Sequence, residues 1–422
     1  MSRLGVTFSR QGEAVRIRWG DGDLRLPPPV RALSRGLGRA VGALVGPWER
    51  RRARPEVATT HVLDLGRHRI SCSIVDVARP TLEGAFGRTL RAVAGQASEE
   101  PLLVVAHADP TEAPGTLVVR FRGSTGSPCR PVDLDAHLLP LLTRHVLDHE
   151  PDELHLHAGG VVLDDRAVLV VGASTQGKST LVAHLAAGGA VLNDEVIGVD
   201  ERRGQLTAFP RPLSLRVGGA AAVEALVVGQ APRPGSTSWV LPTSAIGARH
   251  VSEARPGLIV VPRRRPGPVD VHELAPLDVL EALLLNALDL PRRPADQLRR
   301  ACWLVARSVG VAVAYEEAAD VAGSVRDLDA VRGRRGAEVL HHLDVRVGAM
   351  APAGDDPSVV TVLHGGRALL LLPHGRRVVR LNEVATAAWV GTGAGAHPED
   401  ATAFLEALTE LGSRADGPLS SG

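Results

Sequence analysis

Residues 167–187 read AVLVVGASTQGKSTLVAHLAA. The first five are apolar, as in a buried strand, a glycine-rich turn follows at 172–177, and the residues from Ser179 onward favour a helix. A strand, a turn with the pattern GxxxxGK[ST] and a helix in that order are typical of a phosphate-binding loop. Its backbone N–H groups face the phosphates, and the helix N-terminus adds positive potential. The residues expected at the phosphates are Gly172, Ala173, Ser174, Thr175, Gln176, Gly177, Lys178, Ser179 and Thr180.

Lysine usage supports this interpretation. The chain holds 48 Lys+Arg residues, and Lys178 is its single lysine. A compact ammonium on a flexible stem reaches between the β- and γ-phosphates from a tight loop, whereas a planar guanidinium is too broad. Ser179 is then placed to ligate Mg²⁺ through its hydroxyl. A glycine turn that binds nothing is the alternative.

Two adjacent acids follow the next apolar run. Residues 190–196 read AVLNDEV, so a strand delivers Asp194 and Glu195 near the end of the loop strand. Carboxylate oxygens suit Mg²⁺, and a carboxylate beside the γ-phosphate can accept a proton from an incoming hydroxyl. We expect Asp194 and Glu195 as metal ligands and Asp194 as the base. The alternative is an acidic turn between strands.

Two further side chains are candidates for the same site. His157, in a strand that pairs near the loop strand through the turn 163–166, is expected to contact phosphate or a substrate hydroxyl, unless it is a structural histidine. Arg211, in the turn FPRPL at 209–213, could neutralise phosphate charge, unless it is a surface arginine.

Composition bounds the class of protein. The 422 residues suffice for two or three domains, and 44% hydrophobic with 23% charged residues is typical of a globular protein. The net charge of +1 argues against nucleic acid as a partner. The three cysteines have no metal spacing and indicate reduced thiols, and no apolar run is long enough for a membrane span. We therefore expect a cytoplasmic protein; a homo-oligomer stays open.

Periodicity predicts an α/β protein with a β-rich N-terminal region. Strands are expected within 4–26 and at 102–105, 117–121, 167–171, 190–193, 311–315, 359–363, 368–372 and 377–381. Helices are expected at 30–46, 133–149, 179–185, 276–288, 294–307, 318–331, 382–390 and 398–412. The expected division is a β-rich region of open role at 1–130, a nucleotide-binding domain at 131–332 and a small domain at 338–415.

The run HAGGVVLDDRAVLVVGASTQGKSTLVAHLAAGGAVLNDE, positions 157–195, resembles the catalytic domain of HPr kinase/phosphorylase and related proteins. In that family a histidine-bearing strand precedes a hairpin, a phosphate loop, a helix and a strand that ends in two acids. The resemblance extends over about 133–331. It implies Lys178 on the phosphates, Ser179 on Mg²⁺, Asp194 as the base and Glu195 as a metal or phosphate-site carboxylate, with His157 at the family's catalytic histidine.

The chain departs from the bifunctional enzymes of that family at several positions. They have glycine where Thr175 stands, glutamate where Thr180 stands and aspartate where Glu195 stands, and their later Glu-x-Arg-Gly signature is not found here. These departures leave open a second function, a nucleotide-binding scaffold that presents a peptide without phosphotransfer.

Residues 378–389, VVRLNEVATAAW, resemble PqqD-like domains, small winged-helix modules that hold the leader of a precursor peptide by adding it as an edge strand. A plain winged helix with a structural role is the alternative. Together the resemblances imply an ATP- and Mg²⁺-dependent serine kinase. Its expected partner is a peptide or protein substrate, such as a ribosomally made precursor whose leader binds the C-terminal domain.

Overall fold

The structure is a computed structural model of a mixed α/β protein. It describes residues 6–11, 14–19, 22–26, 58–92, 101–108, 115–122, 124, 126–150, 152–173, 176–216, 219–232, 236, 238–288, 294–332, 344–347, 360–371, 378–383 and 385–387. Two compact units make up the chain. The small unit contains Met1–His61, Ser71–Arg79 and Ala92–Pro131, and the large unit contains Val62–Ile70, Pro80–Arg91 and Val132–Gly422. The expected boundaries near 130 and 335 stay a prediction.

The N-terminal part of the chain is built of short strands. A three-stranded antiparallel sheet holds β1 (Val6–Gln11), β2 (Ala14–Trp19) and β3 (Gly22–Leu26), as the alternating pattern at 4–26 predicts. A second sheet has the order β6-β4-β5-β7-β8-β9. Its strands are β4 (Ala58–Leu65), β5 (His68–Val75), β6 (Leu90–Ala92), β7 (Leu103–His107), β8 (Leu117–Phe121) and β9 (Ser127–Cys129), with α2 (Arg79–Phe86) between β5 and β6.

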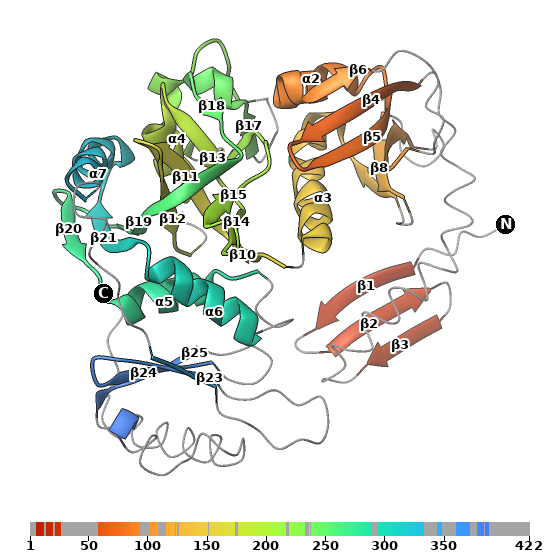
Figure 1. Cartoon of the computed structure of the whole chain (residues 1–422). Coiled ribbons are helices and arrows are strands. Elements are labelled where there is room, and N and C mark those ends of the chain that lie inside the picture. The colour runs from red at the N-terminus through yellow and green to blue at the C-terminus, as the bar shows by residue number, and fades with distance from the viewer. Residues whose placement is uncertain are drawn as a thin grey trace. The chain divides into compact units, whose positions relative to one another are not determined.

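A ten-stranded mixed sheet forms the centre of the large unit (Figure 1). Its path is β10-β14-β15-β19-β12-β11-β13-β18, and β21 pairs with both β19 and β20. The strands are β10 (Leu154–Leu156), β11 (Ala158–Leu163), β12 (Arg166–Val171), β13 (Ala190–Asn193), β14 (Ile197–Asp200), β15 (Gln205–Thr207), β18 (Arg249–His250), β19 (Glu253–Arg264), β20 (Asp270–Glu273) and β21 (Val309–Tyr315). A separate hairpin holds β16 (Leu213–Arg216) and β17 (Ser238–Leu241).

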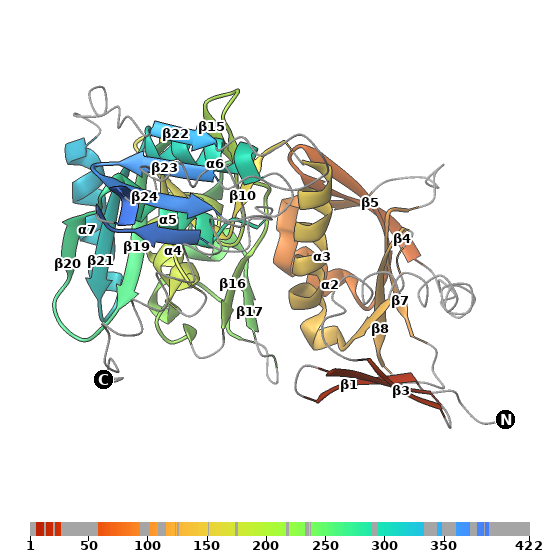
Figure 2. The same ribbon diagram turned by 90° about the horizontal axis from the view of Figure 1, so that it is seen from below.

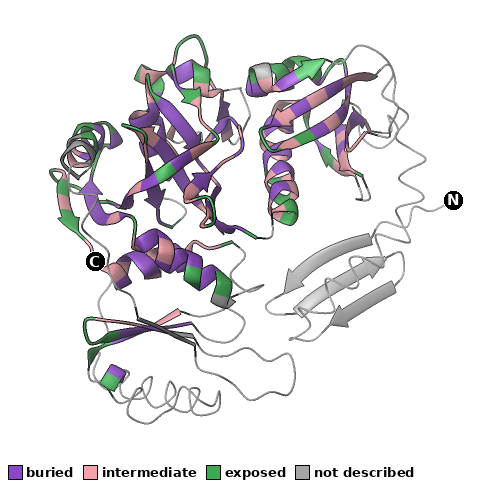
Figure 3. Cartoon of the chain, in the orientation of Figure 1, coloured by how far each residue is buried: buried purple, intermediate pink, exposed green. Residues whose placement is uncertain are grey.

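Helices cover both faces of this sheet. They are α4 (Lys178–Ala186) and α7 (Ala318–Arg332) on one face and α5 (Pro276–Leu285) and α6 (Pro294–Val305) on the other. A further helix, α3 (Leu134–His149), precedes the first strand of the sheet and belongs to neither of these two cores. Successive side chains of a strand point to opposite faces, and β12 shows the consequence. Val168 and Val170 pack in one core with residues of α4 and α7, whereas Leu169 and Val171 pack in another with residues of α5 and α6. Because both faces are covered, residues 167–171 of β12 are buried, as the unbroken apolar run predicts (Figure 3).

Strand β19 was not predicted, although it is the longest strand of the central sheet. It contains Pro256 and Pro262, which lower the expectation of a central strand. The structure accommodates Pro256 and Gly257 at a bulge: Ala167 pairs with Pro256 and Val168 with Leu258, so Gly257 is the extra residue. A Cβ on Gly257 would lie 2.8 Å from the Cβ of Arg166, which explains the glycine.

A four-stranded antiparallel sheet ends the described chain (Figure 2). It holds β22 (Asp344–Val347), β23 (Val360–His364), β24 (Arg367–Leu371) and β25 (Val378–Leu381). Val362, Leu369 and Leu371 share a core with α5 and α6, and Arg380 forms ion pairs with Asp278 and Glu281 of α5. This sheet is therefore packed onto α5.

The remaining expectations have separate outcomes. The predicted helices at 30–46 and 398–412 lie outside the described residues, and of the helix at 382–390 only a short piece is described. The winged-helix fold stays a prediction. Within the described part of the chain, no helix is long and apolar enough to cross a membrane.

Candidate functional site

The loop between β12 and α4 has the arrangement that the sequence predicts. β12 ends at Val171 and α4 begins at Lys178, with Gly177 as its N-cap in the left-handed conformation, φ 78° and ψ 21°. That conformation favours glycine, because most side chains are strained there. At the other end of the loop, a Cβ on Gly172 would lie 2.6 Å from Oε1 of Gln176. Ser174 and Thr175 lie outside the described residues.

Lys178 is buried at the start of α4, with its ammonium held by the loop. Nζ donates hydrogen bonds to the backbone oxygens of Gly172, at 2.6 Å, and Ala173, at 3.3 Å. Burial lowers the pKa of Lys178, and the negative charges of Glu195 and Asp194 oppose this shift. The ammonium thus stays at the mouth of the loop and close to the acid pair.

Asp194 is the most deeply buried acid of the site. Its Oδ2 accepts a hydrogen bond from the backbone N–H of Ser214, at 2.8 Å, and Ser179 donates to the same carboxyl group. Nε of Arg211 lies 3.9 Å from Oδ1, and both side chains are almost fully buried. Burial raises the pKa of Asp194, whereas Arg211 lowers it. Within the described residues neither Oδ1 nor Nε has a hydrogen-bond partner.

Arg211 is therefore not the surface arginine that the sequence left as the alternative. It is the buried counter-ion of Asp194, and its Nη1 also lies 3.5 Å from Oγ1 of Thr143 on α3. The rigid turn around it, with prolines at 210 and 212, was visible in the sequence, but its partner was not.

Asn193 fixes the turn that carries both acids. Its amide donates to the backbone oxygen of Phe209, at 3.0 Å, and its Oδ1 accepts from the backbone N–H groups of Glu195, at 2.8 Å, and Val196, at 3.2 Å. An asparagine oxygen that accepts from N–H groups two and three residues on is typical of a local turn. Asn193 was not among the predicted site residues, although its position directly before two acids is a signal for such a turn.

His157 lies beside Glu195, as the proposed site requires, but not inside a strand. It sits between β10 and β11, and its backbone N–H donates to the oxygen of Asn286, at 2.7 Å. Nδ1 lies 3.2 Å from the backbone oxygen of Glu195 and 3.4 Å from its Oε1. Both side chains are partly exposed, so they form the open side of a site whose closed side holds Lys178 and Asp194.

Tyr315, the single tyrosine of the chain, also contacts the loop, and it was not among the predicted site residues. It ends β21, is buried, and donates a hydrogen bond from its hydroxyl to the backbone oxygen of Gln176, at 3.0 Å. A Cβ on Gly177 would lie 3.1 Å from the same hydroxyl. Burial raises the pKa of Tyr315, so it remains a donor. Its position at the end of a predicted strand was the only signal.

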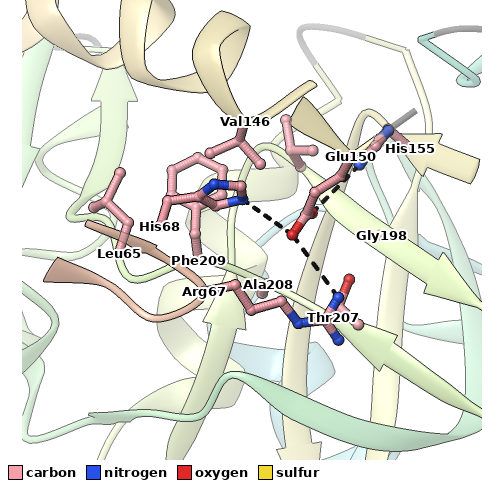
Figure 4. A pocket seen from close by; sticks show the side chains of 11 residues that line it. Leu65, Arg67, His68, Val146, Glu150, His155, Gly198, Thr207, Ala208 and Phe209 are labelled. Atoms are coloured by element: carbon pink, nitrogen blue, oxygen red, sulfur yellow. Dashed lines mark hydrogen bonds and ion pairs between the residues drawn. The ribbon is translucent and has the colours of Figure 1, made fainter. Parts of the chain in front are cut away.

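A second polar cluster lies in the pocket drawn in Figure 4, around Arg67 in the turn between β4 and β5. Nη1 of Arg67 lies 2.5 Å from Glu153 and 3.8 Å from Glu150, and Nη2 lies 3.1 Å from Glu253. Oγ1 of Thr207 donates to the second oxygen of Glu153, at 2.5 Å. Ligand atoms of Glu150, Glu153 and His155 lie within 4.8 Å of one another, but the guanidinium already supplies the positive charge that these carboxylates need.

The residues of the loop site offer oxygen atoms of the kind that Mg²⁺ would require. Asp194 has a buried carboxylate oxygen with no hydrogen-bond partner within the described residues, Ser179 offers a hydroxyl beside it, and Glu195 offers a partly exposed carboxylate. Hard oxygen donors of this kind suit Mg²⁺. No family model matches the chain, and no curated protein matches it.

Proposed function

We propose that the chain is an HPr-kinase-related, ATP-dependent kinase that transfers the γ-phosphoryl group to a serine or threonine hydroxyl of a peptide or protein. One observation carries the proposal. The first turn of α4 holds Lys178 and Ser179, and it lies close to Asp194 and Glu195, which follow β13. His157, which precedes β11, lies beside Glu195. These three segments are distant in sequence, so only the fold brings them together.

Each side chain has a role in this reaction. Lys178 exchanges its loop oxygens for phosphate oxygens and so neutralises charge on the transferred group. Ser179, Asp194 and Glu195 would hold Mg²⁺, which when bound neutralises phosphate charge. Asp194 takes the proton of the substrate hydroxyl while the hydroxyl oxygen attacks the γ-phosphorus. The bond between the γ-phosphorus and the oxygen of the leaving ADP breaks in the same step. His157 orients Glu195 and the incoming hydroxyl at the open side.

The substrate would reach this site through the C-terminal sheet. β25 lies at one end of the β22-β23-β24-β25 order and is joined to α5 through Arg380. An extended leader peptide added to an edge strand gains affinity from backbone hydrogen bonds. Because the sheet packs onto α5, such a peptide would be held at a defined place on the large unit.

A second candidate function, a nucleotide-binding scaffold without transfer, is favoured by one observation. The side chain of Asp194 is 0% exposed, whereas a catalytic base must contact the substrate hydroxyl that it deprotonates. A buried acid paired with Arg211 would then serve only to hold the acid turn against the loop.

The experiment separates the two candidates. Calorimetry with Mg²⁺-ADP measures nucleotide binding, and mass spectrometry of serine-containing peptides incubated with Mg²⁺-ATP measures an added phosphate. If the chain is a kinase, Asp194→Asn should abolish transfer while ADP, measured without Mg²⁺, still binds. Lys178→Met should weaken both transfer and ADP binding. Tight ADP binding without transfer to any peptide, including precursor peptides encoded by neighbouring genes, supports the scaffold. Absence of ATP, ADP and GTP binding overturns both.

A further inference from the structure

The central sheet places the residues of the loop site in a fixed order along one of its edges. β12, β13, β19 and β21 all end at this edge, because β19 pairs in parallel with β12 and β21, and β11 runs antiparallel to both β12 and β13 (Figure 1). The phosphate loop follows β12, in the middle of the row. Asp194 and Glu195, which follow β13, and His157, which precedes β11, lie on one side of the loop. The ends of β19 and β21 lie on the other side.

This order gives a nucleotide bound at the loop a direction. In the proposed reaction the γ-phosphate faces Asp194, Glu195 and His157, and the preceding phosphates lie in the loop. The ribose and the base must then extend away from the acids, over the ends of β19 and β21. Ligands of open α/β sheets bind outside the carboxyl ends of the strands, as this direction requires.

Arg264, the last residue of β19, lies at this end of the row. It is the register partner of Tyr315 on β21, and neighbouring side chains of paired strands share one face of a sheet. Tyr315 packs in the core that contains residues of α4 and α7, and its hydroxyl donates to the backbone oxygen of Gln176 in the loop. Arg264 therefore belongs to the face on which the loop turns into α4, next to the tyrosine that contacts the loop.

The charges at this end of the row are balanced. Nε of Arg264 donates to the backbone oxygen of Glu316, at 3.2 Å, and its Nη2 lies 3.9 Å from Oε1 of Glu317. Arg265 pairs with Asp270 at 3.0 Å. Arginines that are matched by acids suit an uncharged ribose and base better than further phosphates. The N–H groups of a guanidinium donate in its plane, and the Arg264 side chain is 60% exposed, so a flat face is open to stacking.

We propose that Arg264 stacks its guanidinium on the base of the bound nucleotide and so holds the nucleoside end beside the phosphate loop. The inference rests on the proposed function and adds the base-binding side of the same site. Arginine suits this contact because its planar group stacks on aromatic rings, whereas the ammonium of lysine is a compact point charge. Arg263 precedes it on β19 and, because side chains alternate along a strand, points to the opposite face, where Ile259 packs with residues of α5 and α6.

The test compares two probes on the full chain by calorimetry in the presence of Mg²⁺: ADP, which has a base, and inorganic tripolyphosphate, which has none. Arg264→Gln should weaken ADP binding about fivefold and leave tripolyphosphate binding unchanged. Arg264→Lys keeps the charge but not the planar group, so its ADP binding should stay weak. Arg263→Gln removes the same charge one residue away, on the opposite face, and should change neither affinity. Thermal unfolding of each variant confirms that the fold is intact.

Several results would overturn the base contact. Unchanged ADP affinity in Arg264→Gln would do so, and full affinity in Arg264→Lys would show that charge alone suffices. An equal loss for both probes would show that Arg264 acts on the phosphates, and an equal loss in Arg263→Gln would show a general effect of charge. If the unaltered chain binds neither probe, the proposed function itself fails, whereas binding of tripolyphosphate without ADP would retain the phosphate loop and exclude the base contact.

Discussion

Replacement of Arg211 by methionine should destabilise the chain through Asp194. The two charges are 3.9 Å apart and almost fully buried. At an effective dielectric constant of about 20, a pair at this distance interacts by about 4 kcal/mol. Removing one partner of a buried pair leaves an uncompensated charge, so we expect Arg211→Met to lower the free energy of unfolding by about 3–5 kcal/mol at pH 7.

The double variant tests the cause. Arg211→Met with Asp194→Asn contains no buried charge at this position, and its amide can still accept from Ser214, so most of the lost stability should return. Arg249→Met removes an exposed arginine and is the control. Urea unfolding, followed by circular dichroism, gives the free energy of unfolding of the unaltered chain and of these three variants.

The pH dependence gives a second signature. Burial raises the folded-state pKa of Asp194 above its ordinary value of 3.8, and loss of Arg211 raises it further. Between the unfolded and folded pKa values the native state binds more protons, so the single variant should regain stability as the pH falls through that window. A loss of less than about 1 kcal/mol in Arg211→Met, or a double variant as unstable as the single one, would show that Arg211 does not stabilise the fold through Asp194.

Three further predictions concern the loop and the sheet. Tyr315→Phe removes the hydrogen bond to Gln176, worth about 1 kcal/mol, and should weaken Mg²⁺-ADP binding about fivefold by calorimetry; an unchanged affinity would show that the hydroxyl does not hold the loop. Gly177→Ala should lower the free energy of unfolding by about 1–2 kcal/mol because of the positive φ, and by more because the new Cβ contacts Tyr315. Gly204 has a similar φ but open space around it, so the unfolding temperature of Gly177→Ala should be lower than that of Gly204→Ala. Burial lowers the pKa of His250 to about 4, so the unfolded state binds the extra proton between pH 6.5 and 4, and stability should fall by about 3 kcal/mol as the pH drops through that window. His250→Gln should flatten this loss in urea unfolding at successive pH values, and an equally steep loss would contradict the assignment.

Predictions from sequence succeeded where a pattern is local. The apolar run at 167–171, the turn at 172–177 and the helix after it follow from residues adjacent in the chain, and so does the β11–β12 hairpin at 163–166. The N-terminal strands and the last three strands of the C-terminal sheet follow in the same way, because alternation and turn residues report on a few neighbours at a time. The first strand of that sheet, β22, was not predicted.

Long-range pairing had no comparable signal. β19 lies between β12 and β21 although its prolines argue against a central strand, and a bulge at Gly257 makes this possible. The position of such a bulge depends on how the strand pairs with its neighbour, so the residues of β19 alone do not predict it.

The sequence by itself determined the chemistry available to this chain: one lysine in a glycine-rich turn, a serine after it and two acids at the end of the next strand. Only the tertiary structure decided which groups meet them. Arg211 reaches Asp194, Tyr315 reaches a loop 139 residues away, and His68 reaches α3. The physical reason is that the charge state of a buried acid and the shape of a loop depend on groups brought close by folding, and burial and distance are properties of the fold.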